Sequence, residues 1–177
     1  MKSVSTRPHV LLWGMMGSGK STVGPLLAAR LNHDYVDLDA AIEAAASLSI
    51  ADIFVHHGEE AFRQRERDLL KAHLERDTPQ TIALGGGALV DDEWRAFARS
   101  RARVVSLWAT PETLAKRVGH GTGRPLLKED VAESLEALLR TRSRAYADVD
   151  LVVATDLASP QSVAQSVVSA LRDQEAA

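Results

Sequence analysis

The chain has 177 residues, of which 45% are hydrophobic and 25% charged, values typical of one soluble globular domain with a sizeable core. Its 21 basic and 24 acidic residues leave a net charge of −3, which gives no reason to expect nucleic acid or an anionic membrane as a partner. Cysteine is absent, which excludes disulfides, thiolate metal sites and a cysteine nucleophile.

No apolar run approaches the roughly 18 residues that a membrane-spanning helix needs. The apolar stretch near the N-terminus runs directly into a glycine-rich loop, unlike a removable signal peptide. We therefore expect a cytoplasmic protein without a membrane partner. No internal repeat or low-complexity linker interrupts residues 1–177, so we expect one domain. We also expect a monomer.

Short apolar runs alternate with helical patterns along the chain, which indicates an α/β fold with a parallel sheet covered by helices. The sequence predicts strands over 9–13, 34–38, 80–84, 102–108 and 149–154. It predicts helices over 20–32, 39–47, 50–56, 59–76, 91–99, 111–118, 129–146 and 160–173.

Residues 14–21 read Gly-Met-Met-Gly-Ser-Gly-Lys-Ser, a full match to the phosphate-binding pattern G-x-x-x-x-G-K-[ST], the P-loop. The motif lies between a predicted strand and a predicted helix, the context that it requires. Its glycines allow backbone conformations that turn successive N–H groups toward phosphates. The alternative is a plain glycine-rich turn. The motif predicts that the chain binds a nucleoside triphosphate, which we take to be ATP.

Side chains and the following helix complete the predicted nucleotide site. Lys20 supplies a charge for the β- and γ-phosphates, and the Ser21 hydroxyl can bind Mg²⁺. The helix adds its N-terminal dipole and free amides. We predict nucleotide binding by Gly14, Gly17, Ser18, Gly19, Lys20, Ser21 and Thr22.

Two aspartates, Asp37 and Asp39, end the second predicted strand. Residues two apart on a strand face the same way, and ligands of open parallel sheets bind at the carboxyl ends of strands. Two carboxylates there suit Mg²⁺ and a hydroxyl nucleophile. The alternative is that Asp39 only caps the next helix.

Two helices place a charged residue on an apolar stripe. In helix 59–76, Glu66 follows Phe62 by four residues, and Arg63 can pair with it. In helix 129–146, Arg142 continues the stripe of Leu138. Such charges are costly unless they are paired or face a cleft. For the first helix, the alternative is an ion pair at the surface. For the second, it is an arginine that only extends its charge to solvent.

Two glycine-rich segments add to the predicted site. Gly85, Gly86 and Gly87 follow a predicted strand and can let a ligand approach the backbone closely, although a tight turn is the alternative. Three glycines also lie within 119–123, between Arg117 and Arg124. This segment suits a lid that closes over phosphates, although a solvated basic loop is the alternative. His33, His56, His57, His73 and His120 are expected at the surface or its edge.

The chain resembles the shikimate kinases across nearly its whole length, because its motifs occur in the same order along the chain as in that family. Beyond the P-loop, Asp37-Leu-Asp39, the triple glycine and Arg142 four residues before Tyr146 match. The set also includes Ile50-Ala-Asp-Ile-Phe54, Gly58-Glu-Glu-Ala-Phe62-Arg63 with Glu66, and Arg124-Pro125-Leu126-Leu127. The P-loop alone would fit many enzymes, whereas the combination is specific.

The resemblance implies a P-loop kinase fold related to nucleoside monophosphate kinases, with a five-stranded parallel sheet in the order 2-3-1-4-5. It also implies a substrate-binding region near 39–67 and a lid near 117–128. The implied reaction transfers the γ-phosphate of ATP to the 3-hydroxyl of shikimate, giving ADP and shikimate 3-phosphate in aromatic amino acid biosynthesis.

Roles carried over to matching positions place the substrate carboxylate between Arg63 and Arg142, with Gly86 as a backbone donor. Asp39 would contact the substrate hydroxyls, Glu66 would orient Arg63, and Arg124 would reach the phosphates. Lys20, Asp39 and Arg124 would be catalytic, Arg117 would join the nucleotide site, and Ser21 with Asp37 through water would hold Mg²⁺. The substrate pocket would also be lined by Phe54, Phe62, Gly85, Gly87, Pro125 and Leu126.

Other kinases and nucleotide-binding proteins share the P-loop but fit the rest of the sequence less well. A gluconate kinase would share the P-loop but needs no arginine pair for a cyclic carboxylate. A small GTPase needs Asn-Lys-x-Asp, yet the only asparagine is Asn32, followed by His33. A catalytically inactive binding protein conflicts with the complete set of expected catalytic positions. Gln64 and Arg65 differ from the residues usual at these positions in the family, which leaves the orientation of their helix open.

Overall fold

The fold is built on a five-stranded, all-parallel sheet in the order β2-β3-β1-β4-β5. The computed structural model describes residues 7–119 and 131–176. The strands are β1 His9–Trp13, β2 Asp34–Asp37, β3 Gln80–Ala83, β4 Ala102–Trp108 and β5 Leu151–Ala154. Both the predicted strands and the predicted order are confirmed, apart from shifts of one or two residues at strand ends.

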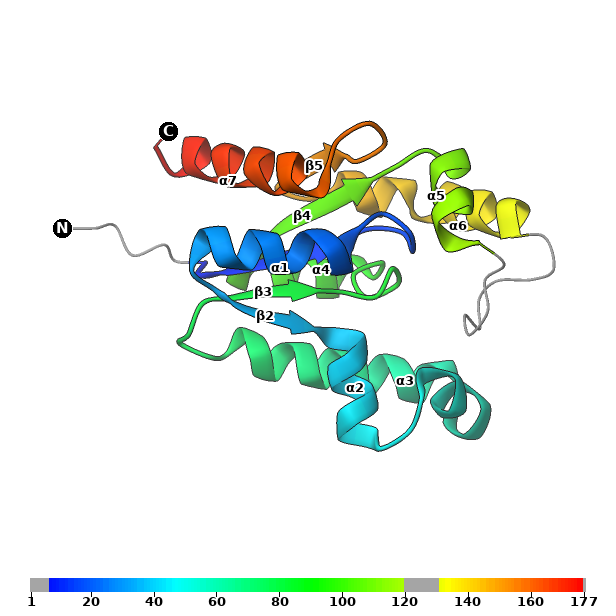
Figure 1. Cartoon of the computed structure of the whole chain (residues 1–177). Helices are drawn as coiled ribbons and strands as arrows, with labels where there is room; N and C mark the ends of the chain where they lie inside the picture. Colours follow the sequence, from blue (N-terminus) through cyan, green and yellow to red (C-terminus); the bar gives the residue numbers. More distant parts are fainter. Residues whose placement is uncertain (1–6, 120–130, 177) are drawn as a thin grey trace.

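One or two helices follow each strand along the chain (Figure 1). They are α1 Lys20–Leu31, α2 Leu38–Ala46, α3 Ile50–Leu74, α4 Asp92–Arg101, α5 Pro111–Val118, α6 Val131–Ala147 and α7 Pro160–Ala176. Within α3, Gly58 takes a non-helical conformation with φ 81°. The sequence predicted two helices on either side of this glycine, and the backbone breaks there as predicted.

Each face of the sheet packs against its own set of helices, as the alternating side chains of β1 show. Leu11 and Trp13 join a core cluster with residues of α2, α3, α4, α5 and α6. Val10 and Leu12 face the opposite cluster, which contains residues of α1 and α7. Because both faces are covered, the central strand β1 is buried along its whole length, and the strand ends are left for the site.

The end of β2 differs from the sequence-based expectation. Asp37 is the last residue of the strand and the N-cap of α2, where its Oδ1 accepts a hydrogen bond from the Ala40 N–H at 3.2 Å. Asp39 therefore lies in the first turn of α2. The helix predicted over 39–47 is confirmed to within one residue, but the expectation that both aspartates end the strand and share one of its faces was wrong. The alternative that Asp39 is the cap was wrong as well. The helix begins early because Asp37 already satisfies one of its free N–H groups.

The strand order brings the predicted motifs to one edge of the sheet. Strand β1 lies between β3 and β4, and β3 lies beside β2. The P-loop after β1, the aspartates at the end of β2 and the glycines after β3 therefore meet at the carboxyl ends of parallel strands. In the part of the chain that the structure describes, no helix is long and apolar enough to span a membrane.

Two histidines near the opposite edge of the sheet are buried. His9 is 1% exposed and donates from Nε2 to the Arg76 carbonyl at 3.0 Å, while its buried Nδ1 has no partner among the described residues. His73 is 7% exposed and bonds to Gln80, so the expectation that it lies at the surface was wrong. Burial lowers the pKa of His9 below its ordinary 6.5; the bond to Arg76 opposes this in part, and His73 adds to it.

We predict that the buried His9 makes the stability of the protein sensitive to acid. The unfolded chain takes up a proton near pH 6.5 whereas folded His9 does so only at lower pH, so its contribution to stability is complete above 6.5 and is lost below it. Between about pH 7.5 and pH 5.5, the melting temperature of the parent should fall more than that of His9→Gln. The exposed His57→Gln is the matched control and should follow the parent. An equal fall in the parent and in His9→Gln would contradict the prediction.

Candidate active site

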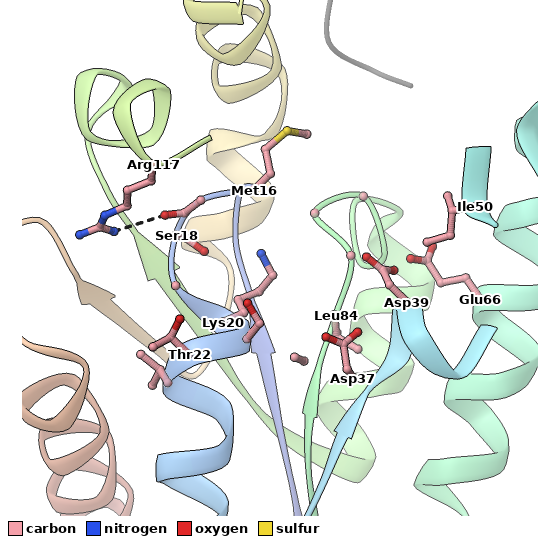
Figure 2. A pocket seen from close by; sticks show the side chains of 18 of the residues that line it. Met16, Ser18, Lys20, Thr22, Asp37, Asp39, Ile50, Glu66, Leu84 and Arg117 are labelled. Atoms are coloured by element: carbon pink, nitrogen blue, oxygen red, sulfur yellow. Dashed lines mark hydrogen bonds between the residues drawn. The ribbon is translucent and has the colours of Figure 1, made fainter. Parts of the chain in front are cut away.

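A cleft of about 870 Å³ opens at the carboxyl edge of the sheet. The P-loop and the start of α1 form one wall, and residues of α2 and α3 form the other. Figure 2 shows Lys20 and Thr22 on one side and Asp37, Asp39 and Glu66 across from them. The cleft thus places a cationic phosphate-binding loop opposite a group of carboxylates.

The P-loop is held in an open curve by its own backbone. Gly14, Gly17 and Gly19 have φ values of 138°, 79° and 102°, a region that side chains disfavour. Lys20 Nζ donates to the carbonyls of Gly14 and Met15, both at 2.9 Å. A Cβ on Gly14 would overlap the Leu107 carbonyl of β4, so this glycine also permits close packing. The motif forms the strand–loop–helix connection that the sequence predicted.

Two carboxylates converge beside Gly85. A Cβ on that glycine would lie 2.9 Å from Glu66 Oε1 and 3.1 Å from Asp39 Oδ1. Both oxygens are buried without a hydrogen-bond partner in the described part of the chain. Burial raises the pKa of Asp39 from its ordinary 3.8, Asp37 raises it further, and Lys20 opposes the rise. Such oxygens favour a ligand that brings hydrogen-bond donors.

The predicted ion pair of α3 is present and largely buried. Arg63 donates from Nη1 to Glu66 Oε2 at 2.7 Å, and Glu66 is 1% exposed. Burial raises the pKa of Glu66, while the charge of Arg63 and its hydrogen bond act in the opposite direction. The Arg63 guanidinium also lies 5.1 Å from the centre of the Phe62 ring. The alternative of a surface ion pair was wrong because the carboxylate is inside the protein.

The glycine loop after β3 is fixed by two aromatic donors. The Tyr146 hydroxyl donates to the Gly86 carbonyl at 2.8 Å, and Trp13 Nε1 donates to the same oxygen at 3.2 Å. Burial raises the pKa of Tyr146 to about 12, so the phenol remains protonated as a donor at neutral pH. Arg142 Nη1 approaches within 3.4 Å of the position that a Gly86 Cβ would take. Sequence reasoning missed Trp13, whose only signal is its place just before the P-loop.

The structure brings most of the predicted site residues into the one cleft. On the nucleotide side these are residues 17–22 and Arg117, with Asp37 opposite. On the substrate side they are Asp39, Phe54, Phe62, Arg63, Glu66, residues 85–87 and Arg142. Gly14 is not among the residues that line the cleft, but its carbonyl accepts a hydrogen bond from Lys20. Arg124, Pro125 and Leu126 lie outside the described residues, as does most of the predicted lid.

The orientation of α3 is settled by the exposed positions of Gln64 and Arg65. Gln64 donates to Asp68 at 2.8 Å on the outer face of the helix. Arg63 and Glu66 consequently face inward. The two residues that differ from those usual in the family do not line the cleft.

Comparison with known proteins identifies the family. The family described as shikimate kinase matches residues 16–172. The chain belongs to the shikimate kinase family. The shikimate kinase of Thermobifida fusca is 42% identical over 169 residues, which covers 95% of this chain and 97% of the relative.

Solved structures agree with this membership of the shikimate kinase family. The shikimate kinase from Acinetobacter baumannii in complex with shikimate superposes with a TM-score of 0.90 at 32% identity, covering 98% of this chain and 97% of the other. A gluconokinase from Sinorhizobium meliloti has a TM-score of 0.66 and 18% identity, covering 94% and 92% of the two chains. At that identity the second likeness concerns the fold alone.

The charges around Asp39 generate a prediction that needs no substrate. The carboxyl carbon of Asp39, followed by NMR, should titrate above the ordinary 3.8 because the group is buried. Asp37→Asn should lower this pKa by removing a like charge, whereas Lys20→Met should raise it by removing an opposite one. A titration at or below 3.8, unchanged in both variants, would contradict the electrostatic description of the cleft.

Proposed function

We propose that this cleft is where the chain, a member of the shikimate kinase family, transfers the γ-phosphoryl group of ATP to the 3-hydroxyl of shikimate. The products are ADP and shikimate 3-phosphate, in a step of aromatic amino acid biosynthesis. The observation that carries the proposal is the joint position of Arg63, Arg142 and the buried Asp39 across the cleft from the P-loop. Shikimate is a cyclic carboxylate with ring hydroxyls, which this set of charges suits.

On the nucleotide side, the P-loop amides and the N-terminus of α1 would surround the phosphates of ATP. Lys20 would place its charge on the β- and γ-phosphates. Its present bonds to the carbonyls of Gly14 and Met15 hold the ammonium group inside the loop that the phosphates would enter. Arg117 lines the same wall and would add a second cation to the nucleotide site.

The oxygen donors of the cleft fit a magnesium ion carried with the nucleotide. Ser21 and Asp37 both line the cleft, and Mg²⁺ is usually held by one or two protein oxygens together with substrate phosphates and water. The described residues contain no group of three or more His, Cys, Asp or Glu that could hold a metal alone. Ser21 would bind the ion directly and Asp37 through water. When bound, Mg²⁺ would neutralise charge on the phosphates.

On the substrate side, Arg63 and Arg142 would hold the carboxylate of shikimate, with a backbone N–H of Gly86 beside them. Glu66 keeps Arg63 in place through the 2.7 Å ion pair. Phe54 and Phe62, whose ring centres are 4.9 Å apart, would form the apolar floor under the ring.

Phosphoryl transfer asks the protein mainly for positioning and charge neutralisation. The Asp39 carboxylate would orient the attacking hydroxyl and accept its proton as the new P–O bond forms. Its raised pKa brings its basicity closer to neutral pH, where a base acts best.

The remaining expectations stay predictions. Arg124 on the phosphates, Pro125 and Leu126 in the substrate pocket, and a lid over 117–128 concern residues that are largely outside the described part. The substrate-binding region of 39–67, the cytoplasmic location, the monomeric state and the absence of nucleic-acid partners also remain predictions.

The function is tested by an ADP-release assay that offers shikimate, gluconate and nucleoside monophosphates in parallel. We expect ADP release to depend on shikimate. Faster release with gluconate or with a nucleoside monophosphate would overturn the proposal in favour of another kinase of this fold.

We predict that Gly87→Ala weakens shikimate binding selectively. The added methyl group would overlap the Arg63 guanidinium, the end of a flexible side chain that can move away. Gly87 is not among the residues with positive φ, so the backbone accepts alanine. Loss of one charge-assisted bond should weaken shikimate affinity about tenfold or more. ATP affinity in the same variant is the control. Equal losses for both ligands, or none for shikimate, would contradict this placement of Arg63.

We predict that Asp39→Asn loses turnover far more than shikimate affinity. The change keeps the shape but removes the charge and the basicity, and a positioned base contributes about 10²-fold or more. Since Asp37 rather than Asp39 caps α2, the helix should keep its stability. Asp34→Asn, at the exposed start of β2, is the matched control. A turnover within about threefold of the parent would exclude an essential role for Asp39.

A further inference from the structure

Thr155 lies directly after β5 and is 3% exposed, yet its hydroxyl meets three groups from separate parts of the chain. Oγ1 donates toward the Ser18 carbonyl at 3.1 Å and the Trp108 carbonyl at 3.3 Å. It also accepts a hydrogen bond from Arg117 Nη1 at 3.0 Å. One small side chain thus joins the P-loop, the end of β4 and α5.

We propose that Thr155 is a positioning residue for the nucleotide, which it acts on through the P-loop peptide between Ser18 and Gly19 and through Arg117. The inference rests on the proposed function in taking the P-loop side of the cleft as the ATP site. No contact between Thr155 itself and the nucleotide is required.

The effect on the P-loop follows from peptide geometry. In a planar trans peptide, the carbonyl and the N–H point in opposite directions. When the Ser18 carbonyl is directed toward the buried Thr155 hydroxyl, the N–H of Gly19 is directed the other way, toward the cleft that Gly19 lines. Gly17 and Gly19, on either side of Ser18, have positive φ, and glycine accepts other backbone conformations as readily. The Thr155 hydroxyl therefore adds an anchor from outside the loop that keeps the N–H of Gly19 facing the phosphates.

The effect on Arg117 follows from its hydrogen bonds. Its planar guanidinium donates to Thr155 Oγ1 and, from Nη2 at 2.7 Å, to the Thr155 carbonyl. The same group reaches the Gly17 carbonyl at 3.3 Å. Two parallel contacts to Thr155 fix the plane of a long side chain that is otherwise exposed on α5. Arg117 and the P-loop consequently take their positions from the same residue.

The hydroxyl, rather than the shape of the side chain, carries this role. A hydroxyl has one hydrogen to donate, and the Trp108 carbonyl already accepts from the Thr155 backbone N–H at 2.8 Å. Replacing the hydroxyl by a methyl group removes the donor to Ser18 and the acceptor for Arg117. The backbone bonds that join Thr155 to β4 and to Arg117 Nη2 would remain.

The test compares Thr155→Val, which keeps the branched shape, with Thr155→Ser, which keeps the hydroxyl. The readouts are the affinity for Mg-ADP by calorimetry without shikimate, KM for ATP, KM for shikimate and the melting temperature. Thr155→Val should weaken Mg-ADP binding and raise KM for ATP by about three- to tenfold, with KM for shikimate within about twofold. Thr155→Ser should restore the parent values. Thr141→Val, which removes an exposed hydroxyl bonded to the Leu138 carbonyl, is the matched control and should behave as the parent.

Equal Mg-ADP affinity in the valine and serine variants would overturn the inference, as would equal rises in KM for both substrates. A lowered melting temperature with unchanged nucleotide affinity would mean a purely structural role and would overturn it as well. If Thr155→Val does not fold, Thr155→Ala against Thr155→Ser makes the same comparison of hydroxyl presence. Failure of the proposed function would give a different result, because the parent itself would then release no ADP with shikimate.

Discussion

The ion pair between Arg63 and Glu66 is the constraint on which the substrate half of the cleft depends. A carboxylate that is 1% exposed is strongly destabilising unless a cation and hydrogen bonds compensate it. Arg63, three residues earlier on α3, supplies both at 2.7 Å. The pair in turn requires open space beside it: a side chain at Gly85 would meet Glu66, and one at Gly87 would overlap Arg63. The glycine run after β3 is therefore needed by the charges of α3 as much as by a ligand.

The same cleft concentrates charge that folding alone would not favour. Burial is the main cause that raises the pKa of both Asp39 and Glu66. Asp37 raises the pKa of Asp39 further, Asp39 raises that of Glu66, and the cations Lys20 and Arg63 oppose these shifts. One oxygen of each carboxylate lacks a hydrogen-bond partner among the described residues. Buried polar groups without partners are rare in folded proteins and cluster at functional sites. A substrate that brings hydroxyl donors to Asp39 would relieve this cost on binding.

Strong local patterns made much of the fold and site predictable from the sequence. The P-loop, the charged residues on apolar stripes and the triple glycine each break a simple periodicity, so their positions could be read directly. The N-cap of α2 was mispredicted, because spacing alone does not show which of two nearby carboxylates, Asp37 or Asp39, caps the helix. Thr155 and Trp13 were missed because each acts through side-chain hydrogen bonds to residues distant in the sequence, and such bonds leave no pattern in the sequence.

The central claim is that Arg63 holds the carboxylate of shikimate in this cleft. It is tested most directly by a double-mutant cycle between protein and substrate, using shikimate and an analogue whose carboxylate is reduced to a hydroxymethyl group. In the parent, kcat/KM should fall about tenfold or more for the analogue, as expected when a charge-assisted bond is lost. In Arg63→Gln, shikimate and the analogue should differ far less, because the partner of the carboxylate is already gone. An equal loss in the parent and in Arg63→Gln would show that the two groups do not interact and would contradict the account.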